Sequence, residues 1–325
     1  MNELVSVIVC AYNNWPDLEL AIQSSLCQSH RNLEVIVVDN SSTDATEREV
    51  PLRFGERVRY VRQPNRGDSS AYNTGIRLAR GEFIQLLDGD DILAPDKIEK
   101  QLEVFRSDPD ADIVYGNIRF FRSLGGQADW IDDDAASFDV SIDGLIRHEG
   151  RCVGAVLGVL FRRRALDRVG PFDEAIYVSD SDYELRAVLA GCRYRPSPGG
   201  VMSFKRIRPG QMGMDRVAML EGAAAFWVKA LSLVHDEGQR DGIRFNLARA
   251  RFARGFRADG LTTAVAIRKC NEARKTCRKA VPALVYFAGI VLLVIPGCRS
   301  LAASPRFRPL RRAVARLFGY KFPST

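Results

Sequence analysis

Short runs of apolar and β-branched residues recur between residues 4 and 205, and each run is followed by a polar stretch. The first three runs cover residues 4–10, 33–39 and 57–62. Runs of this kind, bounded by turn-forming residues, are typical of strands buried on both faces of a sheet. Segments with helical character lie between them, at residues 16–28, 43–50 and 69–79. This alternation predicts an α/β fold with a mostly parallel central sheet flanked by helices.

The fourth apolar run, residues 83–87, ends in a cluster of acids. Three carboxylates follow it within four positions, at Asp88, Asp90 and Asp91. In open α/β sheets, ligands bind outside the carboxyl ends of the strands. Carboxylates this close repel one another unless a cation lies among them, and Mg²⁺ commonly bridges carboxylates to substrate phosphates. The stretch therefore indicates a metal and diphosphate site, although an acidic turn with helix caps before Pro95 would explain it as well.

The elements that follow are spaced less regularly. We expect helices at residues 95–106 and 142–147, a helix that begins at 162–164, and a helix that ends at Ala190. We expect strands at residues 111–121 and 155–161, two short strands within 193–205, and a polar loop at 123–137. From about residue 208, helical periodicity dominates, at 217–235 and 243–257. The sequence thus predicts an α/β domain over residues 1–207 and a helical region over residues 208–325.

The net charge of +7 is distributed unevenly along the chain. Residues 240–325 hold 19 Lys and Arg against 3 Asp and Glu, whereas residues 1–239 hold 28 against 37. A basic region of this kind favours an anionic partner or surface. No recognisable nucleic-acid reader motif accompanies the charge, so we expect no nucleic acid among the partners.

Residues 280–298 are 19 consecutive uncharged positions, close to the length of a membrane span. Both flanks are strongly basic, so a single crossing would not satisfy the positive-inside rule. We expect a re-entrant or surface-lying segment whose basic flanks contact anionic lipid. A buried helix or helical hairpin of a soluble domain is the alternative. Because the seven cysteines form no CxxC pair and no regular framework, we expect reduced thiols in a cytosolic setting. Together with the basic flanks, this predicts a cytoplasmic protein that is peripheral or re-entrant at the inner face of the cell membrane.

Several sequence blocks, each weak alone, form an ordered set within residues 4–205. They are Val5–Asn13, Ser24–Gln28, Glu34–Asp44, Asn65–Gly67, Asn73–Ile76, Gly81–Ile84 and Leu87–Asp91. In this order the blocks resemble those of family 2 glycosyltransferases, which have the nucleotide-sugar-binding GT-A fold. The resemblance implies an inverting transfer from a nucleoside-diphosphate sugar. The Gln-x-x-Arg-Trp block of the family's processive members does not occur here, so we expect one sugar per encounter.

The resemblance also implies which residues bind the donor, with a UDP-sugar as the expected donor. Ala11, Tyr12 and Asn14 would line the pocket for the base and ribose. Asp39 would accept a hydrogen bond from the pyrimidine base. Arg66 and Gly67 would lie along the diphosphate and sugar, and Asp88, Gly89 and Asp90 form the family's DxD motif.

The same resemblance implies the cofactor and the catalytic base. Asp90 would ligate Mg²⁺ or Mn²⁺, and Asp88 would contact the ribose or the metal. The family places its base in a Glu-Asp pair that opens a late helix ending in Arg and Gly. Counting back from Arg186 and Gly191 reaches Ser179-Asp180, so Ser replaces the Glu and Asp180 is the expected base. Asp182 is the alternative base, and a helix N-cap is the structural alternative for Asp180.

These assignments predict a single displacement. The Asp180 carboxylate would remove the proton of an acceptor hydroxyl as that hydroxyl attacks the anomeric carbon. The basic, apolar C-terminal region suggests a glycan or lipid-linked acceptor in cell-surface polysaccharide assembly. Two other classes fit the same sheet, namely a nucleotidyltransferase-like enzyme that needs no acceptor and a non-catalytic protein that binds carbohydrate or lipid.

Overall fold

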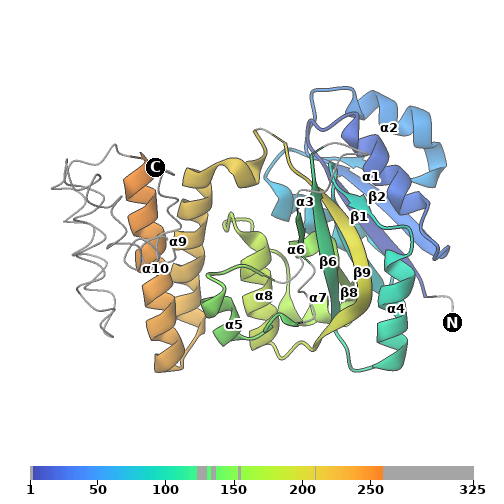
Figure 1. Cartoon of the computed structure of the whole chain (residues 1–325). Helices are drawn as coiled ribbons and strands as arrows, with labels where there is room; N and C mark the ends of the chain where they lie inside the picture. Colours follow the sequence, from blue (N-terminus) through green and yellow to red (C-terminus); the bar gives the residue numbers. More distant parts are fainter. Residues whose placement is uncertain (1–2, 123–129, 133–136, 153–154, 209, 259–325) are drawn as a thin grey trace. The chain divides into compact units, whose positions relative to one another are not determined.

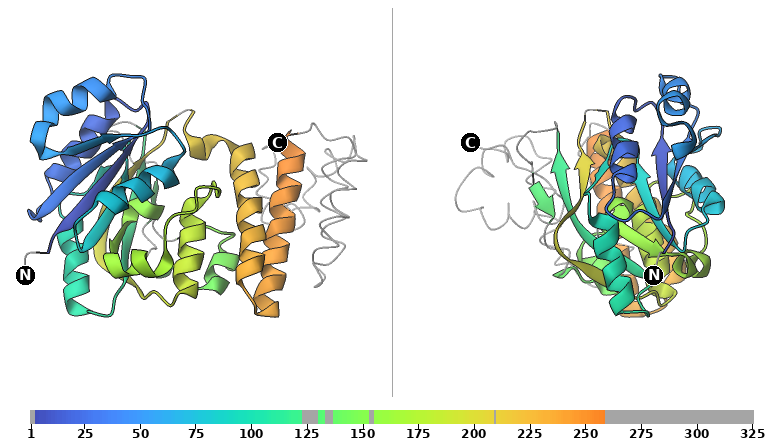
Figure 2. Two further views of the ribbon diagram at one scale, coloured as in Figure 1. Left: turned by 180° about the vertical axis from the view of Figure 1, so that it is seen from behind. Right: turned by 90° about the vertical axis from the view of Figure 1, so that its right-hand side faces the viewer.

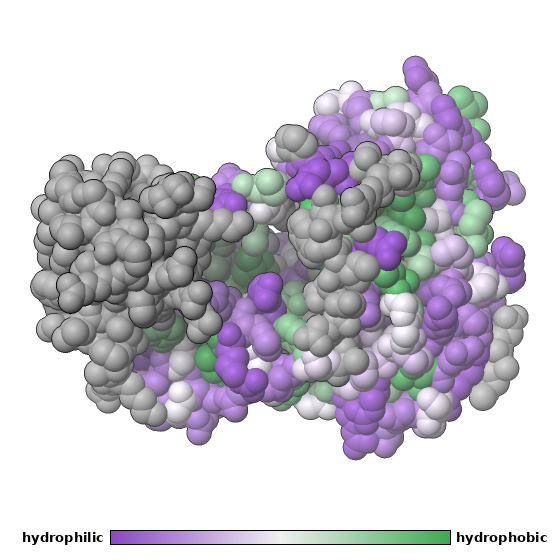
Figure 3. Space-filling model, viewed as in Figure 1, coloured by the Kyte–Doolittle hydropathy of each residue, from purple (hydrophilic) through white to green (hydrophobic). Residues whose placement is uncertain are grey.

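The computed structural model describes residues 3–122, 130–132, 137–152, 155–208 and 210–258. The chain divides into two compact units, Met1–Gln211 and Met212–Thr325 (Figure 1). On the face drawn in Figure 3, hydrophilic side chains predominate over the visible surface of the first unit. The apolar segment predicted at residues 280–298 lies outside the described residues.

The first unit is built on one large sheet with the strand order β3-β2-β1-β4-β8-β6-β9-β5, and β7 pairs with β6. The strands at one side are β1 (Val5–Ala11), β2 (Leu33–Asp39), β3 (Arg59–Arg62) and β4 (Phe83–Asp88). These four strands are all parallel. The runs of Val, Ile and Leu in β1, β2 and β4 are buried, as the β-branched composition of β1 and β2 predicts, whereas β3 at the edge of the sheet is partly exposed.

The other side of the sheet is mixed rather than parallel. Its strands are β5 (Ile92–Leu93), β6 (Ile113–Phe121), β7 (Trp130–Asp132), β8 (Val159–Arg162) and β9 (Tyr194–Arg206). Strand β8 lies antiparallel between β4 and β6, and β9 runs parallel to β6. The predicted α/β fold with helices on a large sheet is confirmed, and its parallel character holds for the first four strands.

Two hydrophobic cores fill the two faces of the sheet, because alternate residues of each strand point to opposite sides. One core packs α1 (Asp17–Leu26), α2 (Thr46–Phe54) and α4 (Lys97–Ser107) on the sheet. The other packs α3 (Asp68–Leu78), α7 (Arg163–Val169) and α8 (Ser179–Leu189) on the opposite face (Figure 2). Short helices complete the unit at η1 (Gly55–Arg57), α5 (Ile142–Arg147) and α6 (Ala155–Gly158).

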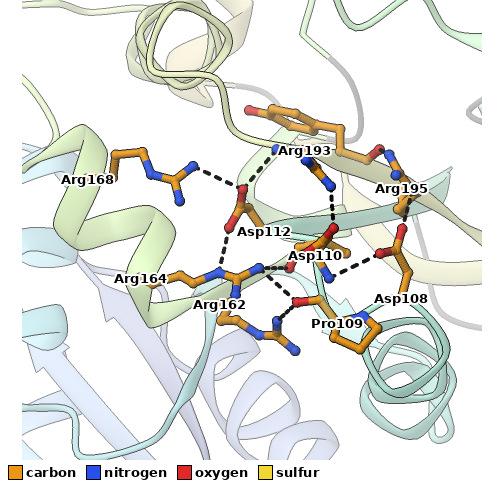
Figure 4. Close-up of polar contacts among 11 residues, drawn as sticks. Asp108, Pro109, Asp110, Asp112, Arg162, Arg164, Arg168, Arg193 and Arg195 are labelled. Carbon is orange, nitrogen blue, oxygen red and sulfur yellow. Dashed lines mark hydrogen bonds and ion pairs between the residues drawn. The ribbon is translucent and has the colours of Figure 1, made fainter.

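A network of ion pairs joins β6, α7 and β9 at one end of the sheet (Figure 4). Its pairs are Asp112 with Arg164 and Arg168, Asp110 with Arg193, and Asp108 with Arg195. Arg162, beside this network, pairs in register with Phe83 at the start of β4. The network therefore lies at the opposite end of the sheet from Asp88. It stabilises the sheet itself and does not contact the acidic edge, which is the end of β4 with Asp88, Asp90 and Asp91.

In the described part of the second unit, η3 (Met212–Met214) precedes two long helices, α9 (Arg216–Leu233) and α10 (Glu237–Ala258). Asp215 caps α9 by accepting hydrogen bonds from the amides of Val217 and Ala218. No helix in the described residues is both long and apolar enough to cross a membrane.

The structure differs from the sequence-based elements in several segments. The predicted polar loop at 123–137 includes the short strand β7, which pairs with β6. Residues 155–161, predicted as one strand, form the single turn α6 before β8 begins at Val159. The carbonyl groups of Leu157 and Gly158 accept hydrogen bonds from buried glutamine side chains, which replaces pairing in the sheet. Residues 193–205, predicted as two strands, form the single irregular strand β9.

Candidate active site

The ends of three parallel strands bring the predicted donor residues to one edge of the sheet. Ala11, the last residue of β1, pairs in register with Asp39 at the end of β2. On the other side of β1, Cys10 pairs with Asp88 at the end of β4. Asp39 and Asp88 therefore flank the end of β1, at the edge where α/β sheets bind ligands.

The loop after β1 holds the second and third predicted pocket residues. Tyr12 is 48% exposed, whereas Asn14 is buried. The Oδ1 atom of Asn14 is buried without a hydrogen-bond partner among the described residues. Such an acceptor is costly unless a ligand or water satisfies it. The amide nitrogen of the same side chain packs against Gly89, where a Cβ would lie 2.3 Å from Nδ2.

Gly89 is the middle residue of the Asp-Gly-Asp sequence, and the structure leaves it no room for a side chain. Its amide donates a 2.8 Å hydrogen bond to the carbonyl oxygen of Cys10. A Cβ at position 89 would also lie 2.8 Å from that oxygen. The turn between β4 and β5 thus requires glycine because the backbone of β1 approaches so closely.

Asp39 is fully buried, and both of its carboxylate oxygens are engaged. One oxygen accepts a 2.9 Å hydrogen bond from the amide of Ser42, and the other accepts a 2.6 Å hydrogen bond from the hydroxyl of Tyr60. Each oxygen keeps a second lone pair for a further donor. The predicted contact with a pyrimidine base stays a prediction.

Arg66 and Gly67 lie immediately before α3, and both are exposed. Gly67 is the N-cap residue of α3 and has a φ of +87°, a backbone conformation that favours glycine. Its carbonyl oxygen accepts a hydrogen bond from Nδ2 of Asn40, in the loop after β2. The amide end of α3 therefore opens toward the same edge as Asp39.

The acids after β4 bind cationic side chains from the end of β9. Asp88 accepts a hydrogen bond from the hydroxyl of Tyr72 and lies 3.4 Å from Nζ of Lys205. Asp91 lies 3.3 Å from the same Nζ and accepts a 2.8 Å hydrogen bond from the amide of Arg206. Asp90 pairs with Nε of Arg208 at 3.1 Å. Lys205 and Arg208 were not identified from the sequence.

Asp180 lies close to these acids although it comes some ninety positions later in the sequence. It is half-buried in the first turn of α8, whose N-cap residue is Val178. The N-cap interpretation of Asp180 is therefore wrong. The alternative base, Asp182, is fully buried and pairs with Nε of Arg186 at 2.8 Å. Asp180 interacts electrostatically with Asp88 and Lys205, so it belongs to the acidic edge.

Burial and mutual repulsion raise the pKa values of several of these acids. Burial raises the pKa of Asp180 to about 6, an effect that Lys205 opposes and Asp88 strengthens. Burial together with Asp88 and Asp180 raises the pKa of Asp68, in the first turn of α3, to about 7. Burial also raises the pKa of Asp91 to about 7, with Lys205 again opposing the shift.

This donor set fits a divalent cation by its chemistry. Five carboxylates interact here, those of Asp68, Asp88, Asp90, Asp91 and Asp180, and the cations of Lys205 and Arg208 oppose them. No group of three His, Cys, Asp or Glu in the described segments could hold a metal alone. Mg²⁺ usually takes one or two carboxylates and completes its shell with water and substrate phosphates. That Asp88 and Asp90 supply such a pair stays a prediction.

Sequence reasoning missed Asp68, Tyr72, Lys205 and Arg208. Asp68 follows Arg66-Gly67 directly, so its place at the start of a helix was a usable signal. Lys205 and Arg208 gave no such signal, because β9 reaches the edge only through its pairing with β5 and β6.

The glycosyl transferase family 2 model matches residues 6–169, half of the chain. The chain belongs to this family. This family 2 glycosyltransferase is 35% identical over 188 residues to an uncharacterized glycosyltransferase of Rickettsia conorii, a match that covers 56% of this chain and 30% of that protein. It is also 41% identical over 114 residues to the chondroitin synthase of Escherichia coli, over 34% of this chain and 17% of the synthase. The chain thus spans less than a third of these two relatives.

Solved structures show the same fold for this glycosyltransferase. Residues 1–349 of TarS from S. aureus, in complex with UDP-GlcNAc, superpose with a TM-score of 0.57 at 19% identity, over 97% of this chain and 88% of that fragment. The mannosyltransferase PcManGT of Pyrobaculum calidifontis, in complex with GDP-Man and Mn²⁺, gives a TM-score of 0.56 at 20% identity, over 96% of this chain and 84% of that one.

Proposed function

We propose that this glycosyltransferase moves one sugar, with inversion, from a nucleoside-diphosphate sugar to an acceptor hydroxyl. The observation that carries the proposal is the proximity of Asp180 to the acids at the end of β4. A carboxylate next to the donor edge can remove the proton of an attacking hydroxyl. One displacement from the opposite face of the sugar then inverts the anomeric carbon.

In this proposal the donor spans the edge formed by β1, β2 and β4. Ala11, Tyr12, Asn14 and Asp39 hold the base and ribose, and the free Oδ1 atom of Asn14 accepts a hydrogen bond from the donor. Arg66 and Gly67 lie along the diphosphate. Lys205 and Arg208, which now pair with the acids, turn their charge toward the phosphates when the donor binds.

Asp90 and Asp88 are the side chains that would hold Mg²⁺ or Mn²⁺, with Gly89 keeping the turn between them tight. The cation, when bound, neutralises the charge that develops on the leaving diphosphate. Asp91 does not take part in metal binding in this proposal, because its carboxylate is fully buried and is held by the backbone amide of Arg206.

The acceptor is a glycan or lipid-linked glycan in cell-surface polysaccharide assembly, approached at the inner face of the membrane. The support is compositional: residues 240–325 carry 19 Lys and Arg against 3 Asp and Glu. Each basic residue near an anionic leaflet contributes about 1 kcal/mol to membrane binding.

The experiment that tests the proposal is calorimetric titration with a panel of UDP- and GDP-sugars, with and without Mn²⁺, followed by a transfer assay. UDP-sugars come first because TarS binds UDP-GlcNAc. We expect one donor to bind more tightly with Mn²⁺ and to release its diphosphate only with an acceptor. A protein that binds no nucleotide sugar, or that exchanges phosphates without an acceptor, would overturn the proposal.

A further inference from the structure

A fully buried lysine lies on the far side of the sheet from α8. Lys97, the first residue of α4, has no exposed surface, although lysine is almost never fully buried unless it is paired. Its Nζ atom donates hydrogen bonds to the side-chain oxygens of Gln85, on β4, and Gln101, on α4. Both partners are neutral amides, and burial lowers the pKa of Lys97 well below its ordinary value. Ion pairing therefore does not explain the lysine.

The lysine instead determines which way both amide groups face. Because Oε1 of Gln85 and Oε1 of Gln101 accept from Lys97, their Nε2 atoms must point the other way. Nε2 of Gln85 donates to the carbonyl oxygen of Leu157 at 3.1 Å. Nε2 of Gln101 donates to the carbonyl oxygen of Gly158 at 2.9 Å. Both acceptors are the last residues of α6.

The single turn α6 carries these contacts to the acidic edge. Val156, in the same turn, lines one small cavity together with Asp180, and its backbone stabilises the ionised carboxylate. A four-residue helix is not stable by itself, so outside contacts must hold it. Besides the two glutamines, the hydroxyl of Ser203 on β9 donates to the carbonyl oxygen of Leu157 at 3.0 Å.

We propose that Lys97, Gln85 and Gln101 are positioning residues for Asp180, acting through α6. They orient the two amides that hold α6, and α6 places Val156 beside Asp180 in the cavity that both residues line. None of the three touches the donor or the acceptor. This inference rests on the proposed function only where Asp180 is taken as the catalytic base.

The test compares Lys97→Met and Gln101→Met with Gln28→Met. Methionine keeps about the same volume and removes the polar group. Gln28 is a matched control because it is also fully buried and hydrogen-bonds to Ser24, Ala94 and Ile98, none of which belongs to α6. All three variants lose buried hydrogen bonds, so a similar loss of thermal stability is expected. If Lys97→Met does not fold, Gln101→Met still tests the proposal.

Two measurements separate positioning from stability. We expect Gln101→Met to lower kcat about tenfold with the donor KM unchanged, and Gln28→Met to leave kcat unchanged. By NMR of carbon-labelled aspartate, the pKa of the Asp180 carboxyl should rise above about 6 in Lys97→Met and Gln101→Met, because the carboxylate loses the stabilisation that the backbone of Val156 provides.

An unchanged pKa of Asp180 in both variants would overturn the inference, and so would an equal kcat loss in Gln28→Met. The NMR titration needs no substrate. A raised pKa in a protein that transfers no sugar would therefore uphold the positioning network and refute the proposed function alone.

Discussion

At the scale of the residue, the acidic edge is governed by the environment that each carboxylate meets. Asp180 and Asp91 have the same side chain, yet Asp91 is fully buried and fixed by the amide of Arg206, whereas Asp180 is half-buried. An accessible carboxylate with a pKa near neutrality suits a general base. The roles proposed for the two acids therefore differ because of their surroundings and not because of their chemistry.

The pKa of Asp180 predicts how sugar transfer depends on pH. A general base works only when ionised, so kcat/KM should rise with pH and reach half its plateau near the pKa of about 6. A profile between about pH 5 and pH 8 tests this. A kcat/KM that is flat over that range would rule out Asp180 as the titrating base.

Asp112 makes a second prediction at this scale, far from the acidic edge. Burial would raise its pKa, but hydrogen bonds from Arg193 and Arg164 outweigh burial and hold the pKa below its ordinary value. Asp112→Asn should therefore cost about 1–3 kcal/mol in the free energy of unfolding at pH 7. The cost should shrink in acid, because the wild-type carboxylate loses its advantage as the pH falls through its folded pKa.

Urea denaturation of both proteins at pH 7 and at about pH 3 measures this effect. Arg193→Lys is a useful comparison, since its backbone amide still donates to Asp112. Equal destabilisation at both pH values would show that the carboxylate charge contributes nothing.

At the scale of the element, strand ends organise the site. Apolar runs followed by polar stretches were enough to predict β1, β2 and β4, and the parallel register of these strands brings Asp39 and Asp88 to one edge. The mixed side of the sheet was harder to predict, because the antiparallel strand β8 is only four residues long and follows a helical turn. The apolar sequence of residues 155–161 fits a strand and a helix equally well. Hydrogen bonds from the side chains of Gln85 and Gln101 to the carbonyl groups of Leu157 and Gly158 favour a helical turn over residues 155–158.

The cationic side of the site could not be predicted for a similar reason. Lys205 and Arg208 approach the acids from the end of β9, more than a hundred residues after Asp88. Nothing in the local sequence of β9 indicates its neighbours. Pairing between strands distant in the chain is set by the whole sheet.

Gly89 provides the test at this scale. In Gly89→Ala the new methyl group would collide with Asn14 and the carbonyl oxygen of Cys10, so the turn after β4 must shift. We expect a loss of about 1–3 kcal/mol in stability and a clear loss of donor affinity. Gly213→Ala is the matched control, because no atom lies within 4 Å of its added Cβ. Titration calorimetry that finds equal donor affinity in both variants would contradict the tight turn.

At the scale of the whole molecule, two parts of the chain differ in the sign of their net charge. Residues 1–239 are acidic in balance, and residues 240–325 are strongly basic. The family match ends at residue 169, so the basic region lies outside that match. Charge of this size and sign acts over about a Debye length and attracts anionic surfaces.

We therefore expect the full-length protein to sediment with vesicles that contain anionic lipid and not with purely zwitterionic vesicles. Binding should weaken steeply as salt is raised, because the attraction is screened. A protein that does not bind the anionic vesicles at low salt would contradict the proposed membrane association. Sugar transfer in solution would be unaffected by that result.

The central claim is that Asp90 would bind the donor through a cation while Asp180 removes the proton of the acceptor hydroxyl. The most direct measurement is a paired comparison of Asp180→Asn and Asp90→Asn, with donor affinity by calorimetry and transfer by initial rate. Asp180→Asn should bind the donor normally and transfer sugar about 10²–10⁴-fold more slowly. Asp90→Asn should lose both donor affinity and transfer. Transfer at the wild-type rate by Asp180→Asn would contradict the account.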